Sequence, residues 1–358
     1  MAGLVVNKSF WKGKKVFVTG HTGFKGSWLV MILKDAGALV AGYSREIPTT
    51  PSVFETCKVS KLLANDYRGD IVDHPKFRQA LHDFSPEIVF HLAAQPLVRS
   101  SYADPFETYN TNVMGTLSVL MAANECLSVN TIVNITTDKC YDNKEWSWGY
   151  RENDSLGGHD PYSSSKACAE ILSSSIRDSF LSKSHKKMAT ARAGNVIGGG
   201  DWAIDRIVPD FMRAYESKSK MQIRNPYATR PWQHVIEPLI GYMTLAEKLY
   251  NDDNFSGAWN FGPDDKDCMN VEYIVNTLHE ILPDHKGIDV QRSAHQPHEA
   301  NFLKLDCSKA KSQLGWHPKF DAKEALKLTA DWYTKFLKGN NMLEVSYDHI
   351  NRYFQHGK

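Results

Sequence analysis

The chain has 358 residues, a length that suits one large domain or two smaller ones. Apolar residues make up 42% and charged residues 23%, a globular composition that excludes a disordered chain. The 42 basic and 41 acidic side chains give a net charge of +1, so no global field attracts nucleic acid or an anionic membrane. We therefore expect neither as a partner.

The chain carries no pattern of a secreted or membrane protein. The amino-terminal segment lacks a long apolar stretch followed by a small-residue cleavage site. Lys34 and Asp35 interrupt the best apolar run, which is too short to cross a bilayer. The six cysteines are scattered without a CxxC pair. We expect a cytoplasmic protein with reduced thiols.

The first informative segment predicts a strand, a turn, a helix and a second strand. Lys15–Thr19 is a short apolar run typical of a buried strand. The following elements are a glycine turn at Gly20, Gly23 and Gly26, a helix over Ser27–Ala36 and a strand over Ala38–Tyr43. This βαβ order implies a parallel sheet.

Further strands and helices alternate as far as residue 195. We expect strands at Glu87–Leu92, Thr131–Ile135 and Met188–Ala193, with helices over Phe106–Cys126 and Ser163–Phe180. The pattern predicts an α/β fold with a doubly wound, Rossmann-type parallel sheet. Residues 1–195 would form the dinucleotide-binding domain and residues 196–358 a smaller mixed α/β lobe for the substrate. That boundary is soft, and we expect the chain to cross between the lobes.

The glycine spacing is typical of a dinucleotide site. Glycines after a strand let the backbone approach a pyrophosphate, which the free N–H groups of the helix start stabilise. The acidic residue expected for the adenosine ribose is absent, because the second strand ends in Ser44 and Arg45. Arg45 would suit a 2′-phosphate, so this pattern leaves NAD and NADP open. Asp70 is either a partner of the adenine or a solvated loop acid.

A second motif predicts redox chemistry on a hydroxyl group. Tyr162 and Lys166 are four residues apart in a helix that begins near Pro161, so they share one face. A free phenol with a pKa of ~10 is a weak base at neutral pH. A nearby ammonium and a positive nicotinamide ring would lower the pKa of Tyr162. Thr137, at the end of a strand, would bind the same hydroxyl.

Other segments carry a family resemblance. They are Leu92-Ala93-Ala94, Asn112 with Gly115 and Thr116, and Arg192-x-Gly194-Asn195. With the motifs above, they resemble the nucleotide-sugar branch of the extended short-chain dehydrogenase/reductase family across nearly the whole chain. Residues 136–170, which include Trp146 and Trp148, are similar to the 4,6-dehydratases of that branch that act on CDP-glucose.

The resemblance implies an NAD-dependent lyase. The sugar would be oxidised at C4, lose water across C5 and C6, and receive the hydride at C6. Tyr162 would take the 4-hydroxyl proton, Lys166 would support Tyr162, Thr137 would orient the hydroxyl and Asp138 would protonate the departing C6 oxygen. Lys139 stands where the family has the glutamate that accepts the C5 proton. We place Lys139 in the site and leave its role open.

The resemblance also implies the binding residues. Those for the cofactor are Gly20, His21, Thr22, Gly23, Phe24, Gly26, Ser44, Arg45, Asp70, Ile71, Leu92, Ala93, Ala94, Tyr162 and Lys166. Those for the CDP-sugar are Asn195, Arg206, Arg230, Arg292 and His298, with Glu299 beside the last. Guanidinium groups suit diphosphate oxygens. Arg206 and Arg292 would otherwise be ordinary solvated charges.

A homodimer is also implied, formed through a four-helix bundle of Asn110–Glu125 and Lys166–Leu181. The implied pathway is deoxysugar synthesis for lipopolysaccharide O-antigen. Another nucleotide-sugar 4,6-dehydratase or a 4-epimerase of the branch stays open, as does a non-catalytic dinucleotide sensor. We expect no metal, because His295 and His298 form the closest histidine pair and no cysteine or carboxylate completes a tetrahedral set.

Overall fold

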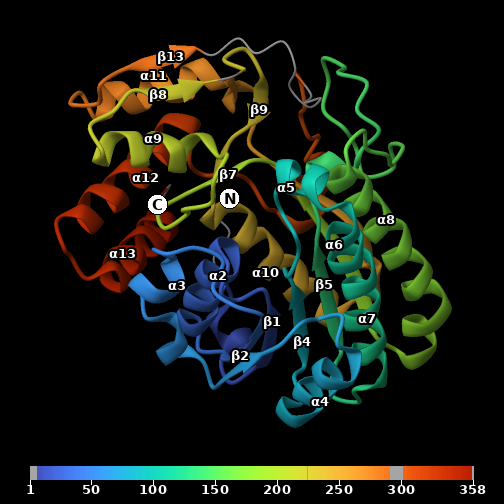
Figure 1. The fold of residues 1–358 in the computed structure, drawn as a ribbon. Helices are drawn as coiled ribbons and strands as arrows, with labels where there is room; N and C mark the ends of the chain where they lie inside the picture. The colour runs from blue at the N-terminus through green and yellow to red at the C-terminus, as the bar shows by residue number, and fades with distance from the viewer. Residues whose placement is uncertain (1–5, 224, 291–300, 357–358) are drawn as a thin grey trace.

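A parallel sheet of seven strands organises the computed structural model, which describes residues 6–223, 225–290 and 301–356 (Figure 1). The strand order is β11-β6-β5-β4-β1-β2-β3. The strands are β1 (Lys15–Thr19), β2 (Leu39–Ser44), β3 (Asn65–Arg68), β4 (Ile88–His91), β5 (Thr131–Ile135), β6 (Lys187–Ala193) and β11 (Gly257–Phe261). The predicted doubly wound α/β fold is confirmed.

Helices cover both faces of this sheet because its strands alternate apolar side chains between two cores. Val16 and Val18 of β1 face one core, and Phe17 faces the other. The first core includes α2 (Phe24–Asp35) and α10 (Ile236–Asn251). The second lies under α4 (His74–Phe84), α7 (Gly115–Glu125) and α8 (Pro161–Ile176).

The two long predicted helices are present with wide turns in them. α6 (Pro105–Tyr109) continues through the π-helical turn η2 (Asn110–Met114) into α7. In the same way, α8 continues through the π-helical turn η4 (Arg177–Leu181). The short helices of this half are α1 (Lys8–Trp11), α3 (Val53–Thr56) and α5 (Val98–Ala103), with 3₁₀ turns η1 (Val59–Leu62), η3 (Asp138–Cys140) and η5 (Ser182–Ser184).

Three small two-stranded sheets and four helices form a second layer over one end of the large sheet (Figure 1). The strand pairs are β7 (Val196–Ile197) with β10 (Gln233–His234), β9 (Thr229–Pro231) with β12 (Cys268–Asn270), and β8 (Met221–Ile223) with β13 (Ile288–Val290). The helices are α9 (Ile207–Glu216), α11 (Val271–Ile281), α12 (Ala322–Leu337) and α13 (Met342–Gln355). Shorter turns are η6 (Asp253–Phe255), η7 (Asp265–Asp267) and η8 (Ala310–Leu314).

The chain returns to the large sheet after entering this layer. β11 pairs in parallel with β6, with Trp259 opposite Ala191. α10 packs against β5 and β6 on the same sheet. Residues 236–261, beyond the predicted domain boundary at residue 195, therefore complete the large sheet. The boundary remains a prediction about which residues bind the cofactor and which bind the substrate. Within the described ranges, every helix is too short or too polar to span a bilayer.

Candidate active site

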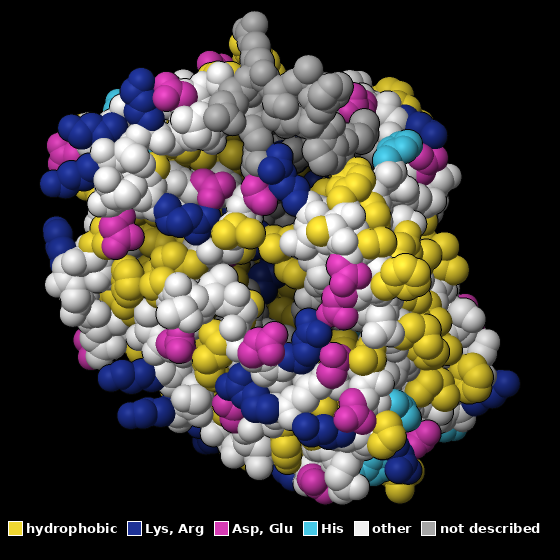
Figure 2. Space-filling model, in the orientation of Figure 1, with side chains coloured by type: hydrophobic (Ala, Val, Ile, Leu, Met, Phe, Trp, Pro, Cys, Tyr) yellow, Lys and Arg dark blue, Asp and Glu magenta, His cyan; other side chains and the backbone are white. Residues whose placement is uncertain are grey.

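A cleft of about 750 Å³ lies between the large sheet and the smaller layer, and it appears as a hollow in the space-filling view (Figure 2). Its lower wall comes from the carboxyl ends of β1, β4 and β5 and from the starts of α2 and α8. Its upper wall comes from residues 194–210 and from β9. Ligands of doubly wound folds bind at this edge of the sheet, so the cleft is the expected site.

The glycine turn forms the floor of the cleft. Gly20 has a left-handed backbone (φ +74°), and a Cβ there would lie 2.7 Å from the backbone nitrogen of Ala93. Gly23 is the N-cap of α2, so the free N–H groups of this helix open toward the turn. Without side chains at 20 and 23, a phosphate can approach these N–H groups. The turn fits a dinucleotide pyrophosphate.

A buried threonine fixes the other side of that floor. The Thr19 hydroxyl accepts hydrogen bonds from the backbone N–H groups of Leu92 and Ala93, each 3.1 Å away. It also lies 2.7 Å from His91 Nδ1, and His91 Nε2 lies 3.1 Å from the hydroxyl of Thr116. Burial lowers the pKa of His91 to about 3, so the ring is neutral. No motif in the sequence predicts this role of Thr19 and His91.

The predicted adenosine end of the site carries an ion-pair cluster. Ser44, Arg45, Asp70 and Ile71 all line the cleft. An Arg45 Nη atom lies 2.8 Å from a carboxylate oxygen of Glu107 and 3.3 Å from one of Asp70. Arg45 is therefore shared between two carboxylates.

His21 does not line the cleft, although the resemblance places it among the cofactor residues. Its ring packs against Gly42, where a Cβ would lie 2.3 Å from the ring. Its two nitrogens lie 3.0 Å from Ser44 Oγ and 2.9 Å from Asp66 Oδ1. His21 thus ties the glycine turn to β2 and β3.

Tyr162, Lys166 and Thr137 meet at the centre of the cleft. Asp160 caps α8 by accepting from the N–H of Ser163 at 2.9 Å, and Tyr162 and Lys166 follow on one face of the helix. The Lys166 ammonium donates to the carbonyl of Ile135 at 3.3 Å. Burial lowers the pKa of Lys166 to about 8.

Burial also raises the pKa of Tyr162 to about 12, against a hydrogen bond with Thr137 and the charge of Arg206, which lower it. The spacing of Tyr162 and Lys166 predicts that Lys166 lowers this pKa. In the protein alone, burial of the phenol raises the pKa of Tyr162 by more than the neighbouring cation and the hydrogen bond lower it. A phenolate here needs further positive charge from a bound ligand.

Asp138 lies in the same part of the cleft, in the 3₁₀ turn η3 directly after β5. One carboxylate oxygen accepts from the Thr137 hydroxyl at 3.0 Å, and the other has no hydrogen-bond partner among the described residues. Burial raises the pKa of Asp138, opposed by the charges of Lys139, Arg230 and Lys25. Lys139 is partly exposed and also lines the cleft.

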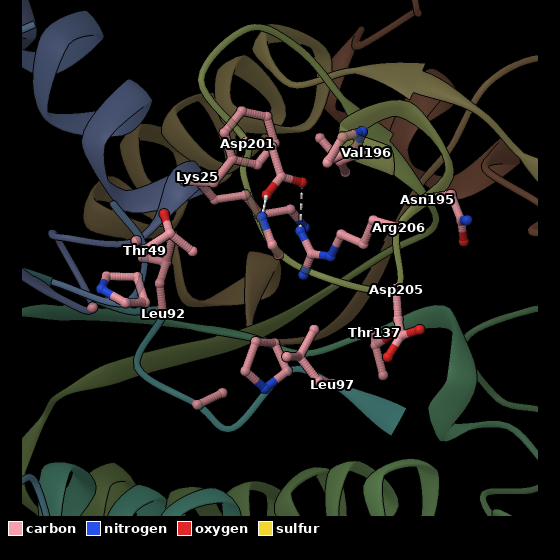
Figure 3. A pocket seen from close by; sticks show the side chains of 18 of the residues that line it. Lys25, Thr49, Leu92, Leu97, Thr137, Asn195, Val196, Asp201, Asp205 and Arg206 are labelled. Carbon is pink, nitrogen blue, oxygen red and sulfur yellow. Dashed lines mark hydrogen bonds and ion pairs between the residues drawn. The ribbon is translucent and has the colours of Figure 1, made fainter. Parts of the chain in front are cut away.

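The upper wall supplies cations and an amide. Arg206 forms an ion pair of 2.7 Å with Asp201, as Figure 3 shows, and Asn195 lines the same wall. Arg230 on β9 is buried and close enough to Asp138 to lower the pKa of that acid. Arg292, His298 and Glu299 lie outside the described residues, as does the pair His295 and His298. Among the described residues, no three metal-ligating side chains are grouped.

Two further features of the cleft have no counterpart among the residues predicted from the sequence. Lys25 lies within the glycine motif, yet its side chain lines the cleft (Figure 3). Arg99 of α5 and Asp205, in the loop before α9, form an ion pair of 3.5 Å between the two walls. For Lys25, the sequence signal is a lysine in the first turn of the helix that the glycine motif opens. No local pattern links positions 99 and 205.

The fold and the cleft are those of a nucleotide-sugar enzyme, and a profile of the GDP-mannose 4,6 dehydratase family matches residues 17–329. The chain belongs to this family. It is 50% identical over 355 residues to CDP-glucose 4,6-dehydratase of Salmonella typhimurium, covering 98% of both chains.

Solved structures share the fold. UDP-glucose 4-epimerase of Thermotoga maritima matches with a TM-score of 0.79 and 24% identity, over 90% of this chain and 99% of that one. dTDP-glucose 4,6-dehydratase of Bacillus anthracis, in complex with NAD, matches with a TM-score of 0.75 and 20% identity, over 92% and 100%. These likenesses concern the architecture of sheet and second layer.

Proposed function

We propose that this protein is an NAD-dependent CDP-glucose 4,6-dehydratase, which forms CDP-4-dehydro-6-deoxy-D-glucose and water. The observation that carries the proposal is the meeting of Thr137, Asp138, Tyr162 and Lys166 in one cleft above a glycine turn. The 50% identity to CDP-glucose 4,6-dehydratase of Salmonella typhimurium supports the choice of CDP-glucose as the substrate. A hydroxyl-directed base and a separate buried acid are the groups that oxidation followed by dehydration needs.

The cradle at Gly20, Gly23 and Gly26 fits the pyrophosphate of a dinucleotide, since side chains there would fill it. Ser44, Asp70 and Ile71 line the adenosine end, and Leu92, Ala93 and Ala94 line the wall between that end and the catalytic groups. When bound there, NAD would supply the oxidising equivalent for C4 and the hydride for C6 of the sugar. Because Arg45 is already paired with Asp70 and Glu107, a 2′-phosphate would compete with two carboxylates, which favours NAD over NADP.

Tyr162 removes the proton of the 4-hydroxyl, while Thr137 holds that hydroxyl by a hydrogen bond. Lys166 supplies positive charge on the same helical face. The C4 ketone then acidifies the C5 hydrogen, so water can be lost across C5 and C6. Asp138 is the acid for the C6 oxygen, since its buried carboxyl has a raised pKa and a free oxygen among the described residues.

The diphosphate of the substrate would bind the upper wall. Arg206 and Arg230 supply guanidinium groups there and Asn195 an amide. Arg292 and His298 stay predicted contacts of the nucleotide.

The dimer proposal is supported by apolar side chains on one flank. Phe106, Met114, Ile171 and Phe180 are 88%, 51%, 59% and 45% exposed. They belong to α6, η2, α8 and η4, and Figure 2 shows hydrophobic side chains gathered on that flank. An Ile171→Glu variant should sediment as a monomer at a concentration where the parent is a dimer.

The place in the cell and the pathway are part of the proposal. All six cysteines are free, which suits a reducing cytoplasm. A 4-keto-6-deoxy sugar nucleotide is a precursor for deoxysugars, and O-antigen synthesis is the pathway implied by the family resemblance.

The test is to incubate the protein with NAD and, separately, with CDP-, dTDP-, UDP- and GDP-hexoses. We expect the alkaline chromophore of a 4-keto-6-deoxy sugar with CDP-glucose, and its loss in a Tyr162→Phe control. Product with another nucleotide alone would overturn the substrate. A 4-epimer without water loss would indicate an epimerase, and cofactor binding without turnover would indicate a sensor.

A further inference from the structure

Lys25 is a cation of the cleft to which the proposed reaction gives no task. It lies in the first turn of α2, and its side chain lines the cleft (Figure 3). Two other cations of the cleft are occupied, Arg206 by Asp201 at 2.7 Å and Lys166 by the Ile135 carbonyl at 3.3 Å. The Lys25 ammonium makes no hydrogen bond or ion pair with any residue that the structure describes. It is therefore available to a ligand.

The charges around Lys25 come from every wall of the cleft. Asp138 follows β5, Lys166 belongs to α8 and Arg206 precedes α9, and all three shift the pKa of Lys25. Burial is the largest cause and lowers the pKa to about 8, with Arg206 and Lys166 acting in the same direction and Asp138 in the opposite one. At pH 7 an amine of this pKa is neutral in roughly a tenth of the molecules, against fewer than one in a thousand for a free lysine.

Lys25 and Asp138 both line the cleft, and the pKa values of the two groups are shifted in opposite directions. Burial lowers the pKa of the Lys25 amine and raises the pKa of the Asp138 carboxyl. The neutral amine, which can accept a proton, and the protonated carboxyl, which can donate one, are therefore both more populated than in the free side chains. The two side chains come from different elements, α2 and the turn after β5. Each is close enough for its charge to act on the other.

We propose that the amine of Lys25 takes the proton from C5 of the 4-keto sugar, an inference that rests on the proposed function. The C5–H bond breaks, its proton passes to the Lys25 nitrogen and its electrons move onto the C4 oxygen as an enolate. The C6–O bond then breaks as Asp138 gives its proton to the leaving oxygen, which yields water and a C5–C6 double bond. When the hydride adds at C6, the Lys25 ammonium returns a proton to C5.

Lys139 keeps a different task in this scheme. It occupies the family's glutamate position, but it is next to Asp138 in the chain and its charge lowers the pKa of that acid. A cation so close to the acid helps Asp138 to release its proton. Lys139 is therefore an electrostatic neighbour of the acid, and Lys25 is the base.

The experiment follows deuterium entering C5 of the isolated 4-keto-6-deoxy CDP-sugar in D₂O, which needs no redox step. Parent protein should catalyse the exchange, and Lys25→Met should lower its rate at least about 100-fold. Lys25→Arg, which keeps the charge but cannot act as a base, should fail equally. Lys34→Met, on an exposed turn of the same helix, is the matched control and should exchange at the parent rate.

Exchange at the parent rate in Lys25→Met or Lys25→Arg would overturn the proposal, as would loss of exchange in Lys139→Met with Lys25 intact. Thermal unfolding and CDP binding verify that each variant is folded. In a second readout, acetylation of the free protein over a range of pH, analysed by mass spectrometry, should show Lys25 titrating near its lowered pKa. If parent protein makes no product from CDP-glucose, the proposed function fails instead.

Discussion

Gly26 lies so close to Gly20 that a Cβ at position 26 would come within 2.2 Å of the Gly20 carbonyl oxygen. The first turn of α2 therefore rests directly on the glycine turn. This contact fixes the distance between the N-terminus of the helix and the floor of the cleft. The third glycine of the motif is a packing requirement, whereas Gly20 is required for its left-handed backbone.

Gly26→Ala should push the helix away from the turn. We expect a loss of about 1–3 kcal/mol in the free energy of unfolding, as for overpacked interiors, and weaker NAD binding. Urea unfolding and calorimetric titration measure the two effects. Gly262→Ala is the control, because its Cβ would meet neighbours at the ordinary distance of 3.4 Å. An unchanged Gly26→Ala variant would contradict this account of the motif.

Asp138→Asn should separate oxidation from dehydration. The amide keeps the shape of the side chain but cannot protonate the leaving oxygen. Reduced nicotinamide should therefore accumulate, which its near-ultraviolet absorbance measures. The rate of deoxysugar formation should fall by about 10²–10⁴-fold. In the parent, dehydration needs the protonated acid. Because burial raises the pKa of Asp138, that form persists to a higher pH than in a free aspartate and is lost as the pH rises through the raised value. A variant that still releases water at the parent rate would exclude Asp138 as the acid.

Glu170→Gln should destabilise the sheet beside the site. Both Glu170 and Arg192 are buried, and Glu170 accepts from Arg192 at 2.8 Å and from Thr190 at 2.7 Å. Removing one partner leaves a buried guanidinium uncompensated, at a cost of about 3–5 kcal/mol in the free energy of unfolding. Asp178→Asn, in an ion pair with Arg177 where the acid is 64% exposed, is the control and should change stability by less than ~1 kcal/mol.

Glu107→Gln should shift the choice of cofactor. The change releases Arg45 from its 2.8 Å ion pair at the adenosine end of the cleft. A guanidinium held by Asp70 alone can bind a 2′-phosphate more readily, so the ratio of NADP to NAD affinity should rise about two- to fivefold, since exposed ion pairs contribute up to ~1 kcal/mol. Titration with both cofactors measures the ratio, and Glu125→Gln, which pairs with Arg78 on another surface, should leave it unchanged.

The large sheet was readable from the sequence because its strands are buried on both faces. Lys15–Thr19 and Thr131–Ile135 are present with the predicted bounds. The predicted Met188–Ala193 differs from the observed strand by one residue at one end, and Ala38–Tyr43 and Glu87–Leu92 differ by one residue at each end. β3 (Asn65–Arg68) was missed because an edge strand of polar residues has neither the apolar run nor a clear alternation. The helix after the glycines begins at Phe24 rather than Ser27, since Gly23 caps it.

The residues proposed as catalytic were predictable because each lies in a local motif whose place in a parallel fold is fixed. Lys25 was passed over because its motif is defined by glycines, and only the folded cleft brings it near Asp138. His21 shows the opposite limit. It belongs to the same motif, yet its ring packs against Gly42 and contacts Asp66, away from the cleft. Such pairings join residues far apart in the chain, which no local pattern encodes.

The return of β11 to the sheet restricts how this enzyme can be divided or recombined. A fragment ending at residue 195 would lose both β11 and α10, leaving the hydrogen-bonding edge of β6 and the apolar side chains of β5 and β6 that pack against α10 uncovered. Uncovered edges recruit other chains and lead to aggregation. Chimeras that exchange substrate layers between relatives should therefore keep residues 236–261 with the cofactor half, and graft the segments on either side of that stretch as two separate insertions.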